Sequence, residues 1–169
     1  SDGGDCTTVA DGFSGSGVAI EQGMDGAVAA YIVVDQHQDR LQRCAPSDGR
    51  ICTTVAGGNG RGTAANQFYG PSAVAIEQGR DGAVAAYIVV DENNHRLQRC
   101  APSDGRICTT VAGGNGQGSA ANQLYGPSGV AIEGMDGAVT AYVVSDLENH
   151  RLQRCAPADG GNCTTVAGG

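Results

Sequence analysis

The chain repeats itself with a period of 55–56 residues, and this repeat restricts the possible folds more than any single motif does. The pentapeptide CTTVA occurs four times, beginning at Cys6, Cys52, Cys108 and Cys163. When residues 44–99 are aligned with residues 100–154, Gln78 has no counterpart and 45 of the other 55 positions are identical. Copies this similar predict one structural unit that is made several times and packs against the next copy.

Each copy is predicted to form four short β-strands. In the middle copy, Ala83–Val90 is continuously apolar and rich in β-branched residues, as in a strand buried on both faces. The dipeptide Asp81-Gly82 before it is a strong hairpin signal, and the PSDG sequence at 102–105 favours a second turn. We expect strands at 73–77, 84–91, 96–100 and 107–112, with equivalents at 17–21, 28–35, 40–44 and 51–56, and at 129–133, 139–146, 151–155 and 162–167.

Four antiparallel strands repeated at this interval are typical of a β-propeller blade. The predicted fold class is therefore all-β, with three blades in residues 1–169 that belong to one propeller segment. The repeats are placed at about 11–56, 57–112 and 113–169. Residues 5–10, within the leading segment 1–10, are predicted to be the outer strand of a preceding blade.

The sequence also resembles a known family. The runs VAGGNGQGSAANQLYGPSGVAIE, DGAVTAYVVSD and ENHRLQRC are similar to the NHL repeat. That repeat typically has a Gly-rich start, a Pro-x-Gly-Val-Ala strand, a Tyr-Val-x-Asp strand and an Asn-His-Arg-Leu turn. The first copy departs from it, with Gln38, Asp39 and Arg40 in place of Asn-His-Arg. The resemblance implies a propeller, commonly six-bladed, so a ring would be completed by further repeats of the parent chain or by a second copy.

Six cysteines form three pairs with the same spacing. Cys44/Cys52, Cys100/Cys108 and Cys155/Cys163 each enclose seven residues and a Pro-Ser-Asp-Gly or Pro-Ala-Asp-Gly turn. Because opposed residues on antiparallel strands lie within disulfide range, hairpin disulfides are favoured over free or metal-bound thiols. Cys6 is expected to be unpaired within this chain. Disulfides indicate an oxidising setting, and hence an extracellular or cell-surface protein.

The charge balance disfavours nucleic acid as a partner. The chain has 18 Asp and Glu residues against 10 Arg and no Lys, for a net charge of −8, whereas binding to phosphate backbones depends on cations. Some cytoplasmic NHL propellers bind RNA through a basic face. Here Arg96, Arg99, Arg151 and Arg154 are interpreted instead as a ladder that pairs with acidic neighbours. The longest apolar run has eight residues, too short for a membrane span of about 20.

Histidines at equivalent positions raise the possibility of a metal site. A lyase of the peptide-amidating pathway, related to this family, holds a metal with histidines from several blades. His95 and His150 are equivalent here, but the first copy has Asp39 at that position and His37 matches neither. We therefore interpret His95 and His150 as ordinary turn residues.

Two further motifs have a structural and a ligand-binding interpretation. The turns that begin at Asp91 and Asp146 could offer oxygen ligands to Ca²⁺, but they lack the EF-hand pattern. A solvated turn, with Asp91 accepting backbone N–H bonds, is favoured. The loops Gly57–Gly62 and Gly113–Gly118 resemble phosphate loops, but no Lys follows. They are interpreted as crossings from one blade to the next.

The sequence assigns no catalytic, cofactor or metal residue. The predicted function is a non-catalytic extracellular NHL-type propeller that acts in protein interaction or as a scaffold. The alternatives are a building block of an extracellular filament and, less favoured, a metal-dependent lyase or hydrolase. One N-x-Thr sequon, at Asn162, is disfavoured by Cys163 in its middle position. An open row of blades is expected to expose apolar end faces with residues such as Ile20, Val33, Ile132 and Val144. These would bind further repeats, a second copy or other extracellular proteins.

Overall fold

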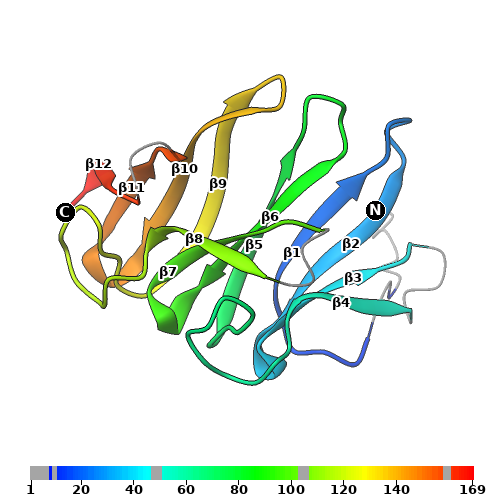
Figure 1. Ribbon diagram of the computed structural model, residues 1–169, viewed down its shortest axis with the longest axis horizontal. Helices are drawn as coiled ribbons and strands as arrows, with labels where there is room; N and C mark the ends of the chain where they lie inside the picture. Colours follow the sequence, from blue (N-terminus) through cyan, green and yellow to red (C-terminus); the bar gives the residue numbers. More distant parts are fainter. Residues whose placement is uncertain (1–7, 9–10, 47–50, 103–106, 158–160) are drawn as a thin grey trace, which may run out of the picture.

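The computed structural model describes Thr8 and residues 11–46, 51–102, 107–157 and 161–169 (Figure 1). These residues form three four-stranded antiparallel sheets, each in simple sequential order. Blade 1 contains β1 (Gly15–Gln22), β2 (Val28–Asp35), β3 (Arg40–Cys44) and β4 (Cys52–Gly57). Blade 2 contains β5 (Pro71–Gln78), β6 (Val84–Asp91), β7 (Arg96–Cys100) and β8 (Cys108–Gly113). Blade 3 contains β9 (Pro127–Met135), β10 (Ala138–Asp146), β11 (Arg151–Cys155) and β12 (Cys163–Gly168).

The strands agree closely with those predicted. The predicted bounds of β2, β3, β6, β7 and β11 are the observed ones. Each fourth strand begins one residue later, at the cysteine that pairs across the hairpin, as Cys44 does with Cys52. The first strands are one or two residues longer at each end, because the ladder with the second strand continues, for example from Ala73↔Val90 out to Pro71↔Asp91. The expected strand at 5–10 lies outside the described residues.

The three sheets lie side by side, with blade 2 between blade 1 and blade 3 (Figure 1). The first strand of blade 2, β5, contacts the first strands of both neighbours, β1 and β9, and the fourth strands lie on the outside. Short 3₁₀ turns join the second and third strands, at Gln36–Gln38 (η1), Glu92–Asn94 (η2) and Leu147–Asn149 (η3). This radial arrangement is that of propeller blades.

The core lies between the blades. At junction 1–2, one cluster joins the back face of blade 1 to the front face of blade 2. The back face is defined by Ala30, Ile32, Val34 and Leu41, and the front face by Val74, Tyr87, Val89 and Cys100. Phe68, from the loop that links the two blades, is also buried there. Successive residues of a strand point to opposite faces, so each blade presents a different apolar set to each neighbour.

Junction 2–3 repeats this packing with equivalent residues. Ala86, Ile88, Val90 and Leu97 form the back face of blade 2, and Leu124 takes the place of Phe68. The front face of blade 3 includes Val130, Ile132, Tyr142 and Val144. The expectation that Ile132 and Val144 are exposed at an end of the row is therefore wrong. They are the equivalents of Ile20 and Val33, so they face the preceding blade, and the free face of blade 3 carries the other set.

The Gly-rich loops are crossings between blades, as expected. After β4 the chain turns at Gly57, where φ is +66° and an added Cβ would lie 2.5 Å from both the Asp39 carbonyl oxygen and Phe68. The loop is internally braced, since the Asn59 amide donates to the Asn66 carbonyl at 3.0 Å and the Gln67 amide donates to the Asn59 carbonyl at 3.0 Å. Among the described residues there is no helix long and apolar enough to cross a membrane.

Candidate functional site

The three predicted cysteine pairs are disulfides: Cys44–Cys52, Cys100–Cys108 and Cys155–Cys163. Each joins the third and fourth strands of a blade at the last pair of the ladder before the turn. Cys100 and Cys108 belong to the cluster at junction 1–2, and Cys155 and Cys163 belong to that at junction 2–3. The disulfides of blades 2 and 3 are thus part of the packing between blades. Cys6 lies outside the described residues.

The loops between blades cover two of the three disulfides. Cys108 N–H donates to the Ala65 carbonyl at 2.8 Å, and Cys163 N–H donates to the Ala121 carbonyl at 2.7 Å. Both cysteines are buried. In the first copy the short link 11–17 stands in place of such a loop, and Cys52 is only half-buried.

A buried aspartate closes each turn between the second and third strands. Asp91 Oδ1 accepts from Tyr69 N–H at 2.8 Å, and its Oδ2 accepts from Asn94 at 2.9 Å and from Arg96 Nε at 2.7 Å. Burial raises the pKa of the Asp91 carboxyl, and these three donors oppose that rise. The predicted backbone N–H bond to Asp91 is therefore present, but the carboxylate is buried rather than solvated.

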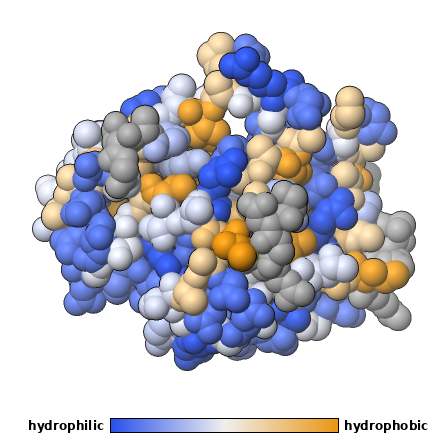
Figure 2. All heavy atoms as spheres, in the orientation of Figure 1, coloured by the Kyte–Doolittle hydropathy of each residue, from blue (hydrophilic) through white to orange (hydrophobic). Residues whose placement is uncertain are grey.

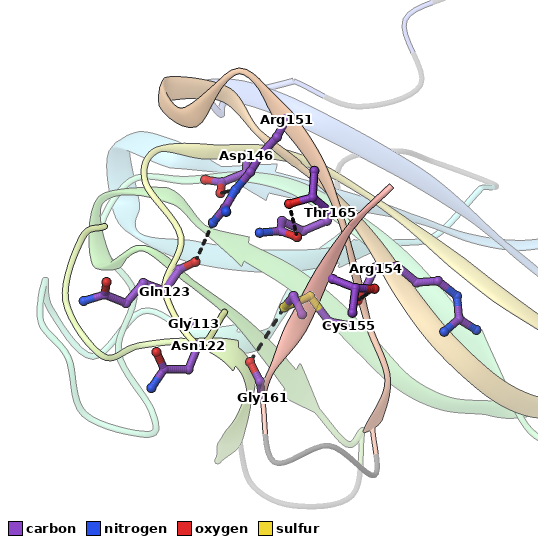
Figure 3. The surroundings of a disulfide bond; sticks show 12 residues. Gly113, Asn122, Gln123, Asp146, Arg151, Arg154, Cys155, Gly161 and Thr165 are labelled. Carbon is purple, nitrogen blue, oxygen red and sulfur yellow. Dashed lines mark hydrogen bonds and ion pairs between the residues drawn. A yellow bond between two sulfur atoms is a disulfide. The ribbon is translucent and has the colours of Figure 1, made fainter. Parts of the chain in front are cut away.

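Blade 3 repeats the arrangement (Figure 3). Arg151 donates from Nε to Asp146 Oδ2 at 2.7 Å and from Nη2 to the Gln123 carbonyl at 3.2 Å, so it ties the turn to the preceding loop. Arg40 and Asp35 form the equivalent pair in blade 1 at 2.9 Å. There, Asp35 Oδ1 is buried without a partner among the described residues. In blades 2 and 3 the equivalent oxygen accepts a hydrogen bond from a backbone N–H of the longer loop, that of Tyr69 or Tyr125. The short link of the first copy provides no such donor to Asp35.

A second set of ion pairs links the first and third strands within each blade. Glu21, Glu77 and Glu133 each accept two hydrogen bonds, from Arg43, Arg99 and Arg154 respectively, at 2.8–2.9 Å. The expected Arg ladder is therefore present.

A tyrosine of the next blade joins the first two of these pairs. The Tyr87 hydroxyl donates to Glu21 at 3.3 Å, and the Tyr142 hydroxyl donates to Glu77 at 3.2 Å. Burial, and then the charge of the facing glutamate, raises the pKa of each tyrosine to about 12. This tyrosine contact was not found from the sequence, although Tyr, Glu and Arg recur at fixed repeat positions.

His95 has structural partners in the loop that leads into blade 3. His95 has a left-handed backbone, with φ at +53°, and its Nδ1 accepts from Gly126 N–H at 3.2 Å, across junction 2–3. Its ring also meets the Tyr125 ring edge-on, at 5.6 Å between centroids. Asp39 does the equivalent at junction 1–2, where its Oδ1 accepts from Gly70 N–H at 2.7 Å. A carboxylate and an imidazole are interchangeable there because either can accept that bond.

The two end faces carry exposed apolar side chains. On the front face of blade 1, Val18 is 65% exposed and Ile20 is 54% exposed, as predicted for Ile20, whereas Val33 is buried and its Cγ1 lies beside Gly15. A groove of about 300 Å³ lies on this face, lined by Phe13, Gly15, Ser16, Val18, Tyr31 and Val33. On the back face of blade 3, Leu152 is 41% exposed, beside a groove of about 310 Å³. In the view of Figure 2, apolar side chains gather in small groups between hydrophilic ones.

A third groove, of about 450 Å³, lies between the β5–β6 and β9–β10 hairpins. Its lining includes Ile76, Arg80, Ile132 and Met135. No three His, Cys, Asp or Glu residues of the described ranges are grouped so as to hold a metal ion. Asn162 of the sequon is exposed, but the hydroxyl of Thr164 donates to the Arg154 carbonyl at 3.4 Å.

Comparisons with known proteins give the fold. No protein-family model and no curated protein matches the chain. An auxiliary nutrient binding protein from Bacteroides thetaiotaomicron superposes with a TM-score of 0.62 at 16% identity, over 81% of this chain and 36% of that one. A streptogramin B lyase superposes with a TM-score of 0.53 at 14% identity, over 90% of this chain and 40% of the other. A virginiamycin B lyase variant from Staphylococcus aureus, with quinupristin, gives 0.53 at 16% identity, over 90% and 40%. The chain thus spans well under half the length of these neighbours, and what it shares with them is the architecture of β-propeller blades.

Proposed function

We propose that this protein is a non-catalytic, extracellular propeller module of the NHL type that serves in protein interaction or as a structural scaffold. The observation that carries the proposal is the set of structural contacts that the polar side chains make. In each blade an Asp–Arg pair closes a turn and a Glu–Arg pair braces the sheet, and at both junctions a tyrosine joins the Glu–Arg pair of the preceding blade. The Asp, Glu and Tyr side chains of these sets, which could act as acids, bases or ligands, are thus held in equivalent structural contacts from blade to blade.

The extracellular setting is supported by the three disulfides, which form and persist in oxidising compartments. The NHL assignment is supported by the repeat sequence. In the structure, Asn94 and Arg96 of the Asn-His-Arg turn donate hydrogen bonds to Asp91. His95 of the same turn accepts a hydrogen bond from Gly126, in the loop that leads into blade 3.

A filament building block is the second candidate. It is favoured by the near identity of junctions 1–2 and 2–3, since equivalent residues make equivalent contacts at each. A repeated contact of this kind allows units to be added in a row.

The metal-dependent lyase remains the third candidate, because two of the structural neighbours are lyases by name. Elemental analysis of protein secreted in oxidised form separates it from the first two. We expect less than one equivalent of bound Zn²⁺ or Ca²⁺ after dialysis. A stoichiometric metal liganded by residues from two or more blades would contradict the non-catalytic proposal.

A further inference from the structure

The two ends of the row of blades present the two halves of a junction that the chain makes twice internally. Junctions 1–2 and 2–3 each join a back face to the front face of the next blade. In the part of the chain that the structure describes, no blade covers the front face of blade 1 or the back face of blade 3. We propose that the front face of blade 1 binds the back face of blade 3 of a second copy of this chain. The inference rests on the proposed scaffold function and names its partner.

The apolar residues of the two end faces are those that become buried where a neighbouring blade is present. On the back faces, Leu41 and Leu97 are fully buried at the internal junctions, whereas Leu152 at the equivalent position is 41% exposed. On the front faces, Val74 is 8% exposed at junction 1–2, whereas Val18 is 65% exposed. Docking of a second copy would bury these side chains as the internal junctions do, and apolar burial is the main driving force of association.

The polar contact of the junction is also divided between the two ends. Glu133, braced by Arg154, is 47% exposed on blade 3, whereas Glu21 and Glu77, which face a tyrosine, are 13% and 12% exposed. Tyr31 of blade 1 is the equivalent of Tyr87 and Tyr142, and among the described residues it makes no bond to a glutamate. Docking would bring the Tyr31 hydroxyl of one copy to the Glu133 carboxylate of the other.

This complementarity selects a second copy over an unrelated partner. The two faces differ from each other, and each matches a face already buried against its counterpart inside the chain. The contact is therefore head-to-tail. Such contacts generate a closed ring if the rotation from each copy to the next returns to the first copy, and an open chain if it does not. A front-to-front dimer would instead place the two Tyr31 side chains opposite each other. A back-to-back dimer would place the two Glu133–Arg154 pairs opposite each other.

The test uses one blocking substitution on each face and sedimentation velocity at physiological salt. Val18→Arg blocks the front face of blade 1, Leu152→Arg blocks the back face of blade 3, and Met24→Arg at the tip of the first hairpin, 90% exposed, is the matched control. We expect the wild type and Met24→Arg to form dimers or larger assemblies, and each blocked variant alone to be monomeric. An equimolar mixture of the two blocked variants should form a 1:1 dimer, since one intact front face and one intact back face remain.

Other results would overturn the proposal. A wild type that stays monomeric at its highest soluble concentration excludes self-docking, and a blocked variant that still dimerises alone indicates a front-to-front or back-to-back contact. Folding of each variant is checked by circular dichroism and by its three disulfides.

The proposed tyrosine contact is tested by a double-mutant cycle. Tyr31→Phe and Glu133→Gln should each weaken association roughly three- to tenfold, and together by no more than either alone. Additive effects would contradict the contact. The metal content tests the scaffold function separately. A protein that is monomeric and free of metal would therefore contradict only the self-docking proposal.

Discussion

The hydroxyl of Tyr142 donates a hydrogen bond to Oε2 of Glu77 at 3.2 Å, although the two residues are 65 positions apart and belong to different blades. Glu77 is also bonded by Arg99 at 2.8 and 2.9 Å, so one carboxylate braces its own sheet and the junction with the next. The same trio occurs at junction 1–2 with Tyr87, Glu21 and Arg43.

We expect the loss of this carboxylate charge to be costly because Glu77 is largely buried. Glu77→Gln should lower the free energy of unfolding by about 1.5–3 kcal/mol, the usual range for hydrogen bonds to charged groups. Glu133→Gln removes an equivalent pair that is half-exposed and screened by solvent, so it should cost clearly less than Glu77→Gln. Denaturant unfolding of dilute protein measures both, and equal costs for the two variants would contradict a role for the tyrosine junction.

Alkaline pH should destabilise the protein through its buried tyrosines. An unfolded tyrosine titrates near its ordinary value of about 10, whereas the pKa of Tyr87 and of Tyr142 is about 12 in the fold. A group whose pKa is raised on folding stabilises the fold below its unfolded pKa. That stabilisation is lost as the pH rises from about 10 through about 12. The facing Arg43 and Arg99 keep their charge over this range, because their hydrogen bonds with glutamates raise their pKa further.

Unfolding free energies measured between about pH 9 and 12 should therefore fall more steeply for the wild type than for a Tyr87→Phe/Tyr142→Phe variant. Phenolate absorbance should show a late-titrating pair that this variant lacks. Prior treatment with iodoacetamide blocks thiol exchange at high pH. Parallel curves for the two proteins would refute the assignment.

The three disulfides should be reduced in order of access. Cys108 and Cys163 are 3% and 6% exposed and lie under interblade loops, whereas Cys52 is only half-buried. Brief treatment with a phosphine should therefore open Cys44–Cys52 first. Alkylation with a light label, full reduction and alkylation with a heavy label will locate the first thiols by peptide mapping. Equal labelling of all three pairs would show that the loops do not protect them.

Gly57 should tolerate a methyl group much less well than Gly60 in the same loop. Both have positive φ, which costs an alanine about 1–2 kcal/mol. At Gly57 the new Cβ would also meet Phe68 and the Asp39 carbonyl oxygen at 2.5 Å, whereas at Gly60 nothing lies within 4 Å. Gly57→Ala should therefore cost about 2–5 kcal/mol, because overpacking adds to strain, and Gly60→Ala about 1–2 kcal/mol. Thermal and denaturant unfolding of the two variants provide the comparison.

Local patterns predicted the strands and the disulfides because the causes of both are local. Apolar alternation and Asp-Gly turns define the hairpin of the first and second strands. The ladder between the third and fourth strands places Cys44 opposite Cys52, and it places the equivalent cysteines of the other blades opposite each other in the same way. The Arg ladder was predictable for the same reason, since Asp91 and Arg96 are paired residues of adjacent strands.

The orientation of the blades was decided only by the tertiary structure. Period-2 alternation gives a strand two faces but does not say which one meets the preceding blade, and so Ile132 and Val144 were wrongly expected at a free end. The Tyr142–Glu77 bond and the His95–Gly126 bond join neighbouring units, and a single repeat specifies only one half of each. Sequence by itself determined the unit and its covalent links. The packing of one back face on the next front face determined which residues are buried between units and which are left exposed at the ends.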